Sequence, residues 1–139
     1  MKPKPISTAD APAAIGAYSQ GMALGGYVNL VFTSGQIALD LEGNMVGNGD
    51  IALETKQVLN NLNAVLHAAG SSKDCVIRAT IYLMAMDDFP KVNEIYAAYF
   101  GEHKPARACV AVAALPKDAR IEIDFVATKT FFGSLCPST

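Results

Sequence analysis

One segment, Cys75 to Met84, constrains the fold of this chain more than any other. In an extended strand, alternate side chains point to opposite faces. One face carries Ile77, Ala79, Ile81 and Leu83. The other carries Val76, Thr80 and Tyr82, which are also strand-forming residues and together are too apolar to lie in water. The pattern predicts a strand inside a sheet that is covered on both faces.

Two predicted helices flank this strand in the sequence. Asp50 is placed to cap a helix of about twenty residues that Gly70 ends, and its apolar positions recur at helical spacing: Val58, Leu62, Val65, Leu66 and Ala69. Asp87-Asp88 is placed to cap a second helix with Pro90 in its first turn and Gly101 at its end. Its apolar stripe consists of Phe89, Val92, Ile95, Tyr96 and Tyr99.

The remaining segments predict further strands. The first forty residues have the pattern of short strands, with Asn29 to Gly35 the most β-rich among them. Turns are expected at Gly25-Gly26, Leu41 to Asn44 and Gly47 to Gly49. Arg107 to Val112 and Ile121 to Thr128 are the last two strands. This order predicts an α+β sheet with both helices on one face, and a second subunit is the simplest cover for the other face.

Length and composition favour a single globular domain spanning residues 1–139. The chain is 51% hydrophobic and 17% charged, and this apolar excess fits either an extra buried subunit interface or a compact monomer with a large core. The formal net charge is −2 and the basic residues form no run, so nucleic acid is not expected as a main partner. Residues 129–139 form a tail to which the sequence assigns no role.

Targeting, membrane and metal signals are absent from the sequence. The longest apolar stretches are strand-sized, and no apolar segment follows the lysines at the N-terminus, so neither a membrane span nor a secretory signal is expected. Cys75, Cys109 and Cys136 form no CxxC and share no ligand spacing with His67 or His103. We therefore expect no metal, no cofactor and reduced thiols in a cytoplasmic protein, with a mitochondrial location left open.

The most informative polar residue is Arg107, in the segment Pro105-Ala106-Arg107-Ala108-Cys109-Val110. In a strand it shares a face with Cys109 and Ala111. An arginine among small apolar residues either extends to solvent or holds an anion, and a structural salt bridge at a sheet edge is the ordinary alternative. Its planar fork suits a carboxylate, which it can bind through two hydrogen bonds. The segment by itself favours the structural salt bridge.

Glu122 is the matching candidate on the last strand. If the loop before it closes a hairpin, a pairing of Glu122 with Ala111 puts the carboxylate on the face of Arg107, whereas a shift of one residue removes it. A partly buried carboxylate can act as a general base. The alternative is a glutamate that faces solvent, and spacing alone does not separate the two.

Two further candidates are Cys109 and the loop that contains Tyr18 and Ser19. Cys109 could be a nucleophile, but neither histidine stands at a recognisable spacing, so a small buried residue is the better interpretation. Tyr18 and Ser19 occupy an apolar loop and either line a pocket or pack there.

Six segments resemble one family in the same order: Ala11 to Gln20, Thr33 to Ile37, Asp88-Phe89 with Val92 to Tyr96, Pro105 to Arg107, Ala114 to Lys117, and Ile121 to Ile123. It is the reactive intermediate deaminase family, also known as the YjgF/YER057c/UK114 family. The resemblance extends from about Ile6 to Thr128. It implies chorismate-mutase-like subunits that assemble as a homotrimer around a central barrel, with an active site in each cleft between subunits.

The resemblance also implies an activity and its residues. The best-known branch hydrolyses 2-iminopropanoate and 2-iminobutanoate, reactive products of pyridoxal-phosphate enzymes, to 2-oxo acids and ammonia. Arg107 would hold the substrate carboxylate, and Glu122 would activate water. The residues that would shape the pocket are Tyr18, Gly35, Phe89, Asn93 and Cys109.

The resemblance leaves open how rigid the Tyr18 loop is and which activity the chain has. Ala17 stands where proline is common in the family, so the Tyr18 loop can be less rigid. Tyr18 is expected to face the Arg107–Glu122 pair of a neighbouring subunit. Other members of the family are described as endoribonucleases that inhibit translation or as chaperones. A further alternative is a non-catalytic protein that binds small acids in the same pocket.

Overall fold

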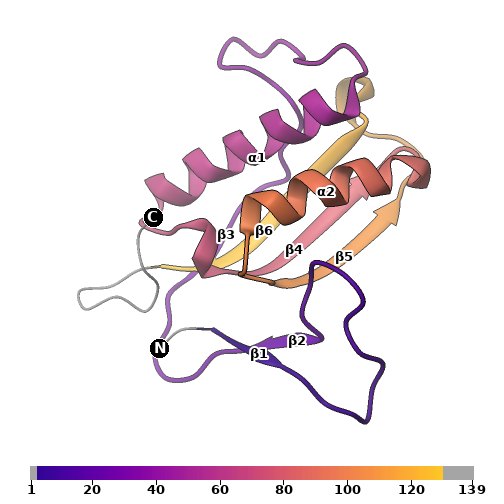
Figure 1. Ribbon diagram of the computed structural model, residues 1–139. Helices are drawn as coiled ribbons and strands as arrows, with labels where there is room; N and C mark the ends of the chain where they lie inside the picture. The colour runs from indigo at the N-terminus through magenta and orange to yellow at the C-terminus, as the bar shows by residue number, and fades with distance from the viewer. Residues whose placement is uncertain (1–2, 130–139) are drawn as a thin grey trace.

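The computed structural model describes residues 3–129 and contains two sheets and two long helices (Figure 1). β1 (Lys4–Ile6) and β2 (Gly21–Ala23) form a small antiparallel ribbon. The main sheet has the strand order β3-β6-β4-β5. Its strands are β3 (Leu30–Phe32), β4 (Val76–Leu83), β5 (Ala106–Ala111) and β6 (Ile121–Thr128). The tail that was predicted from residue 129 onward lies, except for Lys129, outside the described residues.

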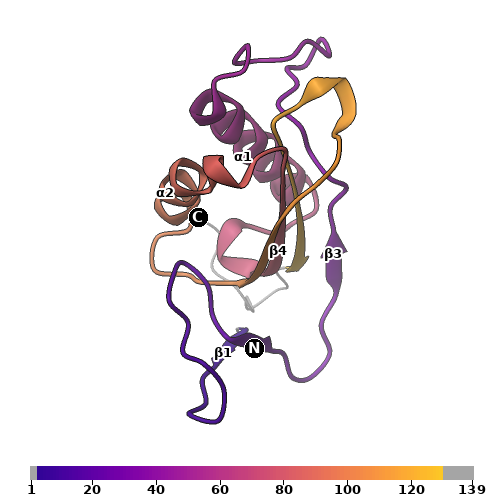
Figure 2. The same cartoon turned by 90° about the vertical axis from the view of Figure 1, so that its right-hand side faces the viewer.

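Both long helices cover the same face of the main sheet, which confirms the predicted α+β arrangement (Figure 2). α1 is Ile51–Ala68, and the carboxylate of Asp50 accepts hydrogen bonds from the backbone amides of Ala52 and Leu53, as a capping residue should. Gly70 follows with a φ of +73°, the left-handed conformation in which a glycine commonly ends a helix. Neither helix is long and apolar enough to cross a membrane, within the part of the chain that is described.

α2 (Phe89–Phe100) also lies where the sequence predicts it, but it begins differently. Asp88 occupies the N-cap position without making a capping hydrogen bond through its side chain. Its carboxylate is bonded to Arg120 instead. Short 3-10 turns precede or follow the main elements at Lys73–Cys75, Met86–Asp88 and Pro116–Asp118.

The last two strands do not form the hairpin on which the pairing of Glu122 with Ala111 depended. β5 pairs with β4 in parallel and β6 pairs with β4 antiparallel, so β4 lies between them. The backbone amide of Val112 donates to the carbonyl of Leu83, and the amide of Met84 donates to the carbonyl of Arg120, so the connection passes the end of β4. Because α2 forms the crossover from β4 to β5, a parallel pairing follows, and β6 takes the other edge of β4.

The hydrophobic core lies between the helices and one face of the sheet. It includes Ala79, Ile81 and Leu83 of β4 and Ile121, Ile123 and Phe125 of β6. A bulge between Val76 and Arg78 brings Val76 to this buried face, whereas the alternation in the sequence had placed it on the opposite face. The predicted burial of Ala79, Ile81 and Leu83 is confirmed.

The opposite face of the main sheet is not covered by the described residues. Leu30, Phe32 and Val110 are 46%, 71% and 43% exposed, and Phe32 pairs in register with Val126. Thr80 and Tyr82 of β4 are partly buried on this face. We call it the open face of the sheet; it is the face that the sequence analysis expects another subunit to cover.

Candidate functional site

The guanidinium of Arg107 is surrounded by aromatic rings and one amide. Nη1 donates to Oδ1 of Asn93 over 2.6 Å. The guanidinium carbon lies 4.9 Å from the centre of the Tyr96 ring and 5.4 Å from the centres of both the Phe89 and the Tyr18 rings. These distances are those of cation–π contacts. We call the four residues around the guanidinium the arginine cage.

Three members of the arginine cage come from α2. Phe89, Asn93 and Tyr96 are spaced so that they lie along one face of that helix. β5 carries Arg107 opposite Ala79, on the face of the sheet that the helices cover, and this brings the guanidinium against α2. The sequence analysis had proposed Phe89 and Asn93 as pocket residues but had assigned Tyr96 to the apolar stripe alone.

The fourth member, Tyr18, is held beside Arg107 by hydrogen bonds to the start of β5. The Ser19 amide donates to the Pro105 carbonyl over 3.3 Å, and the Ser19 hydroxyl donates to the carbonyl of Lys104. Tyr18 therefore packs on Arg107 of its own chain. The expectation that it faces the arginine of a neighbouring subunit is wrong, because this loop is tied to the strand that carries its own arginine.

The positive charge of Arg107 has no acidic partner among residues 3–129. The two salt bridges within this range join Lys91 to Glu94 and Arg120 to Asp88. The structural salt bridge that the sequence favoured for Arg107 is therefore not found there. A cation held by neutral groups keeps its capacity to bind an anion.

The groups next to Arg107 are kept uncharged. Burial raises the pKa of Tyr96, and the Arg107 charge only partly opposes that rise. Burial likewise raises the pKa of the half-buried Cys109 thiol, again against the smaller effect of Arg107. A raised pKa disfavours the thiolate, so a small packing residue describes Cys109 better than a nucleophile does.

Glu122 lies on the open face of the sheet, away from Arg107. It pairs in register with Tyr82, which pairs with Val110, whereas Arg107 is opposite Ala79 on the covered face. Directly paired residues share a face of a sheet, so the two candidates point to opposite sides with β4 between their strands. The predicted pairing of Glu122 with Ala111 is wrong.

Gly35 and Glu122 are in contact. A Cβ built on Gly35 would lie 2.8 Å from the carboxyl carbon of Glu122 and 3.0 Å from its Oε2. Only a residue without a side chain leaves room for the carboxylate in this place. The Gln36 amide donates to the Ile123 carbonyl over 2.9 Å, which holds this segment against β6.

A second carboxylate accompanies Glu122 on the open face. Asp124 accepts a hydrogen bond of 3.0 Å from the Tyr82 hydroxyl. This hydrogen bond, which favours the protonated phenol, is the main reason that the pKa of Tyr82 is raised. The predicted site residues thus form two separate groups in one chain: the arginine cage with Cys109, and Glu122 with Gly35.

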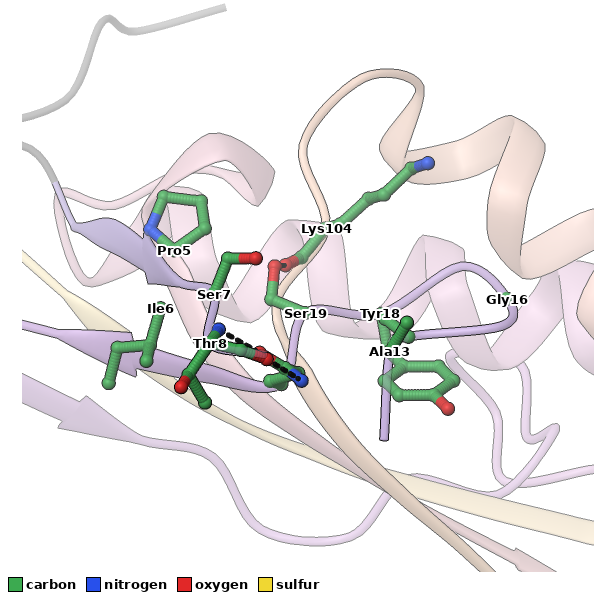
Figure 3. Close-up of a pocket in the computed structure, with 11 residues that line it drawn as sticks. Pro5, Ile6, Ser7, Thr8, Ala13, Gly16, Tyr18, Ser19 and Lys104 are labelled. Carbon is green, nitrogen blue, oxygen red and sulfur yellow. Dashed lines mark hydrogen bonds between the residues drawn. The ribbon is translucent and has the colours of Figure 1, made fainter. Parts of the chain in front are cut away.

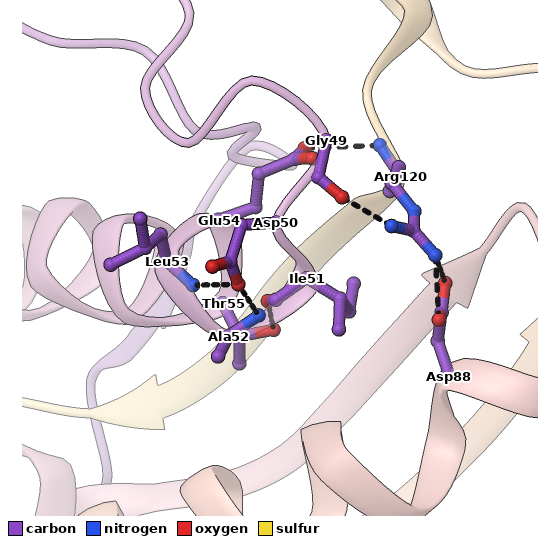
Figure 4. A network of polar contacts seen from close by, with 9 residues as sticks. All are labelled: Gly49, Asp50, Ile51, Ala52, Leu53, Glu54, Thr55, Asp88 and Arg120. Carbon is purple, nitrogen blue, oxygen red and sulfur yellow. Dashed lines mark hydrogen bonds and ion pairs between the residues drawn. The ribbon is translucent and has the colours of Figure 1, made fainter.

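Arg120 is the centre of a polar network that the sequence analysis did not identify (Figure 4). The network joins the start of α2, the start of α1 and the residue before β6. The Arg120 guanidinium donates to both carboxylate oxygens of Asp88 over 2.7 Å and to the carbonyl of Gly49. Its backbone amide donates to the buried carboxylate of Glu54 over 3.1 Å. The network joins the residue before Phe89 to the residue two before Glu122, so it braces both groups.

A cavity of about 360 Å³ lies against the Tyr18 loop (Figure 3). Its lining includes Thr8, Gly16, Tyr18, Ser19 and Lys104 but neither Arg107 nor Glu122. The side chain of Lys104 extends away from Thr8. The cavity is therefore a neighbour of the arginine cage and does not contain the charged candidates. No group of three or more His, Cys, Asp or Glu side chains between residues 3 and 129 is placed to hold a metal ion.

Comparison with known proteins relates the chain to one group of sequences. The family model described as "Endoribonuclease L-PSP" matches residues 8–129. A RutC family protein of Pyrococcus horikoshii is 50% identical over 89% of this chain and 96% of its own. The 2-iminobutanoate/2-iminopropanoate deaminase of Rattus norvegicus is 46% identical over 91% of this chain and 90% of its own. The crystal structure of Escherichia coli TdcF with bound serine has a TM-score of 0.68 and 40% identity, covering 91% of this chain and 99% of that one.

Proposed function

Because the chain belongs to the endoribonuclease L-PSP family, also known as the YjgF/YER057c/UK114 family, we propose that it hydrolyses 2-imino acids to 2-oxo acids and ammonia. The substrates are small imines such as 2-iminobutanoate and 2-iminopropanoate, which the names of several relatives contain. The observation that carries the proposal is the positive charge of Arg107, which lies in a cage of neutral groups and has no acidic partner among residues 3–129.

Arg107 binds the carboxylate of the imino acid in this proposal. With Nη1 bonded to Asn93, the rest of the guanidinium is available for a second and third hydrogen bond to the two carboxylate oxygens. Nη2 lies 3.6 Å from the position that a Cβ would take on Gly16, so the absence of a side chain there keeps the approach open. The Phe89 and Tyr18 rings favour a small apolar group next to the carboxylate.

Glu122 is the general base that activates water in the proposed hydrolysis. It takes a proton as a water oxygen bonds to C2 of the protonated imine, which gives a tetrahedral intermediate. The proton then passes from Glu122 to the nitrogen. Glu122 takes the proton of the new hydroxyl as the C2 carbonyl forms, the C–N bond breaks and ammonia leaves. A protonated imine is already electrophilic, so holding the carboxylate and delivering one water suffice without a metal or a cofactor.

The two groups must come from different subunits for this chemistry. Arg107 and Glu122 lie on opposite faces of one chain's sheet, so Glu122 can serve only the arginine of another copy. We propose a homotrimer in which the β5 edge of one subunit, with its arginine cage, lies against Glu122 and Gly35 on the open face of the next. The exposed apolar residues Leu30, Phe32 and Val110 support this assembly, since a contact between copies would bury them.

The test is direct hydrolysis of an imine produced in situ. Threonine dehydratase releases 2-iminobutanoate, and the early appearance of 2-oxobutanoate is followed with and without this protein. We expect the rate to rise in proportion to the protein added, whereas a Glu122→Gln preparation at the same concentration should add little. A rate that does not change with the wild-type protein would reject the proposal. Cleavage of a single-stranded RNA by the same preparation, with no effect on the imine, would point to the ribonuclease activity that the family's description names.

A further inference from the structure

Tyr96 differs from the other rings around Arg107 in how firmly it is held. It is fully buried on α2 and packs on Phe100 with 4.8 Å between ring centres. Tyr18 is on a loop, and Phe89 is the first residue of its helix; both are only partly buried. Tyr96 also lies closest to the guanidinium carbon, at 4.9 Å. Of the three rings, it is therefore the one whose place the core determines.

The hydroxyl of Tyr96 does not explain why a tyrosine is buried here. It is buried and has no hydrogen-bond partner among the described residues. A buried polar group without a partner destabilises a fold. The ring, by contrast, has a clear function, because its electron-rich face attracts the guanidinium above it.

We propose that Tyr96 is a positioning residue for Arg107: its ring face holds the guanidinium in place, so that the edge not bonded to Asn93 is presented to the carboxylate of a small acid. The inference rests on the proposed role of Arg107 as the carboxylate anchor. The affinity for the acid then depends on the electron density of the Tyr96 ring, although this ring does not touch the acid.

The test measures carboxylate binding apart from hydrolysis. The probe is 2-oxobutanoate, the stable product, and its Kd is measured by titration. Tyr96→Phe comes first, followed by phenylalanines at position 96 with increasing ring fluorination, which keep the size of the ring but withdraw electrons from its face. Tyr96→Leu removes the aromatic face altogether. Tyr99→Leu is the matched control, since Tyr99 lies one turn along the same helix and stacks on Phe125 rather than on Arg107.

We expect Tyr96→Phe to bind within about twofold of wild type and the fluorinated series to bind progressively more weakly. Tyr96→Leu should raise the Kd on the order of tenfold. Tyr99→Leu should lose stability with little change in Kd. A merely structural role for Tyr96 predicts no trend along the fluorinated series, and that result would overturn the inference even if Tyr96→Leu failed to fold.

The NMR signal of the Arg107 Nε–H group separates this inference from the proposed function. The rings around it should displace this signal upfield in the wild-type protein. Tyr96→Leu removes one ring current whatever the role of the ring, whereas the fluorinated rings keep it, so a shift of the signal along the fluorinated series reports a movement of the guanidinium. A signal that does not change along the fluorinated series would overturn the positioning role, whatever the activity. If the signal responds but the wild-type protein does not hydrolyse imines, the proposed function fails and the positioning role stands.

Discussion

A lysine at position 107 would keep the charge of the arginine but not its planar fork. We expect Arg107→Lys to lower kcat/KM for imine hydrolysis. The corresponding activation free energy should rise by about 2–4 kcal/mol, the range for losing a charged contact in a dry site. Steady-state kinetics with 2-iminobutanoate would measure the loss. Lys91→Arg, the reverse exchange at an exposed residue of α2, is the control. Nearly full activity in Arg107→Lys would remove the arginine from the carboxylate-binding role.

Glutamine at position 122 preserves the shape of the glutamate and its contact with Gly35 but cannot accept a proton. Glu122→Gln should fold and assemble as the wild type does, yet hydrolyse imines about 10²–10⁴-fold more slowly. Single-turnover rates, together with thermal unfolding of the same preparation, would measure both effects. A well-folded variant with the wild-type rate would make Glu122 a structural residue.

Gly35→Ala tests the same carboxylate from its neighbour. The new Cβ would collide with the end of the Glu122 side chain, at 2.8 Å from the carboxyl carbon. Because that side chain is flexible and lies on the open face, it can move aside at little cost in stability. We expect hydrolysis to fall about 10–100-fold with a nearly unchanged midpoint of thermal unfolding. In the Glu122→Gln background the same change should have little further effect, and an additive loss would show that Gly35 acts on something else.

At the scale of elements, the start of α2 is held by an ion pair rather than by a cap. The Asp88 side chain is 12% exposed and accepts two hydrogen bonds from Arg120, whose side chain is 37% exposed. Asp88→Asn should lower the free energy of unfolding by about 1–3 kcal/mol, measured by urea denaturation, because a partly buried guanidinium loses a two-point charged contact. The matched control is Glu94→Gln in the exposed pair with Lys91, which should change stability by less than about 0.5 kcal/mol. Equal effects of the two changes would contradict the bracing role of the Asp88–Arg120 pair.

Helix ends were predictable from the sequence, whereas strand partners were not. Asp50 and Gly70 act through hydrogen bonds and backbone conformation within a few residues, so the limits of α1 follow from local chemistry. The pairing of β6 depends on which edge of β4 is free, and α2 decides that by carrying β5 to the other edge. The hairpin prediction failed because chain neighbours need not be sheet neighbours.

At the scale of the whole molecule, the opposite orientations of Arg107 and Glu122 make a definite prediction about mixed assemblies. Arg107→Lys and Glu122→Gln subunits should complement each other in the proposed trimer, since every mixed ring has one cleft with both residues intact. Co-refolding equal amounts at random should restore about a quarter of the wild-type rate, because three quarters of the rings are mixed and one cleft in three is intact in each.

The control for this experiment pairs two residues of the same group. Tyr18→Ala and Arg107→Lys subunits should not complement each other, because Tyr18 packs on its own chain's Arg107. The compositions of the mixed rings would be checked by native mass measurement and the activity by imine hydrolysis. A gain with the Tyr18 pair, or none with the Glu122 pair, would contradict the proposed division of the site between subunits.

The sequence by itself determined the α+β class, both long helices, the central strand and the candidate residues. The helices and the central strand depend on side-chain periodicity and capping residues, which act locally. The candidate residues follow from the segments that occur in the same order in the family. Only the tertiary structure decided that β4 separates β5 from β6, that Val76 turns inward at a bulge, and that Tyr18 and Tyr96 enclose Arg107. Each of these depends on contacts between residues far apart in the chain. Alternation within a strand specifies which side chains share a face, but the packing of the helices decides which face is buried.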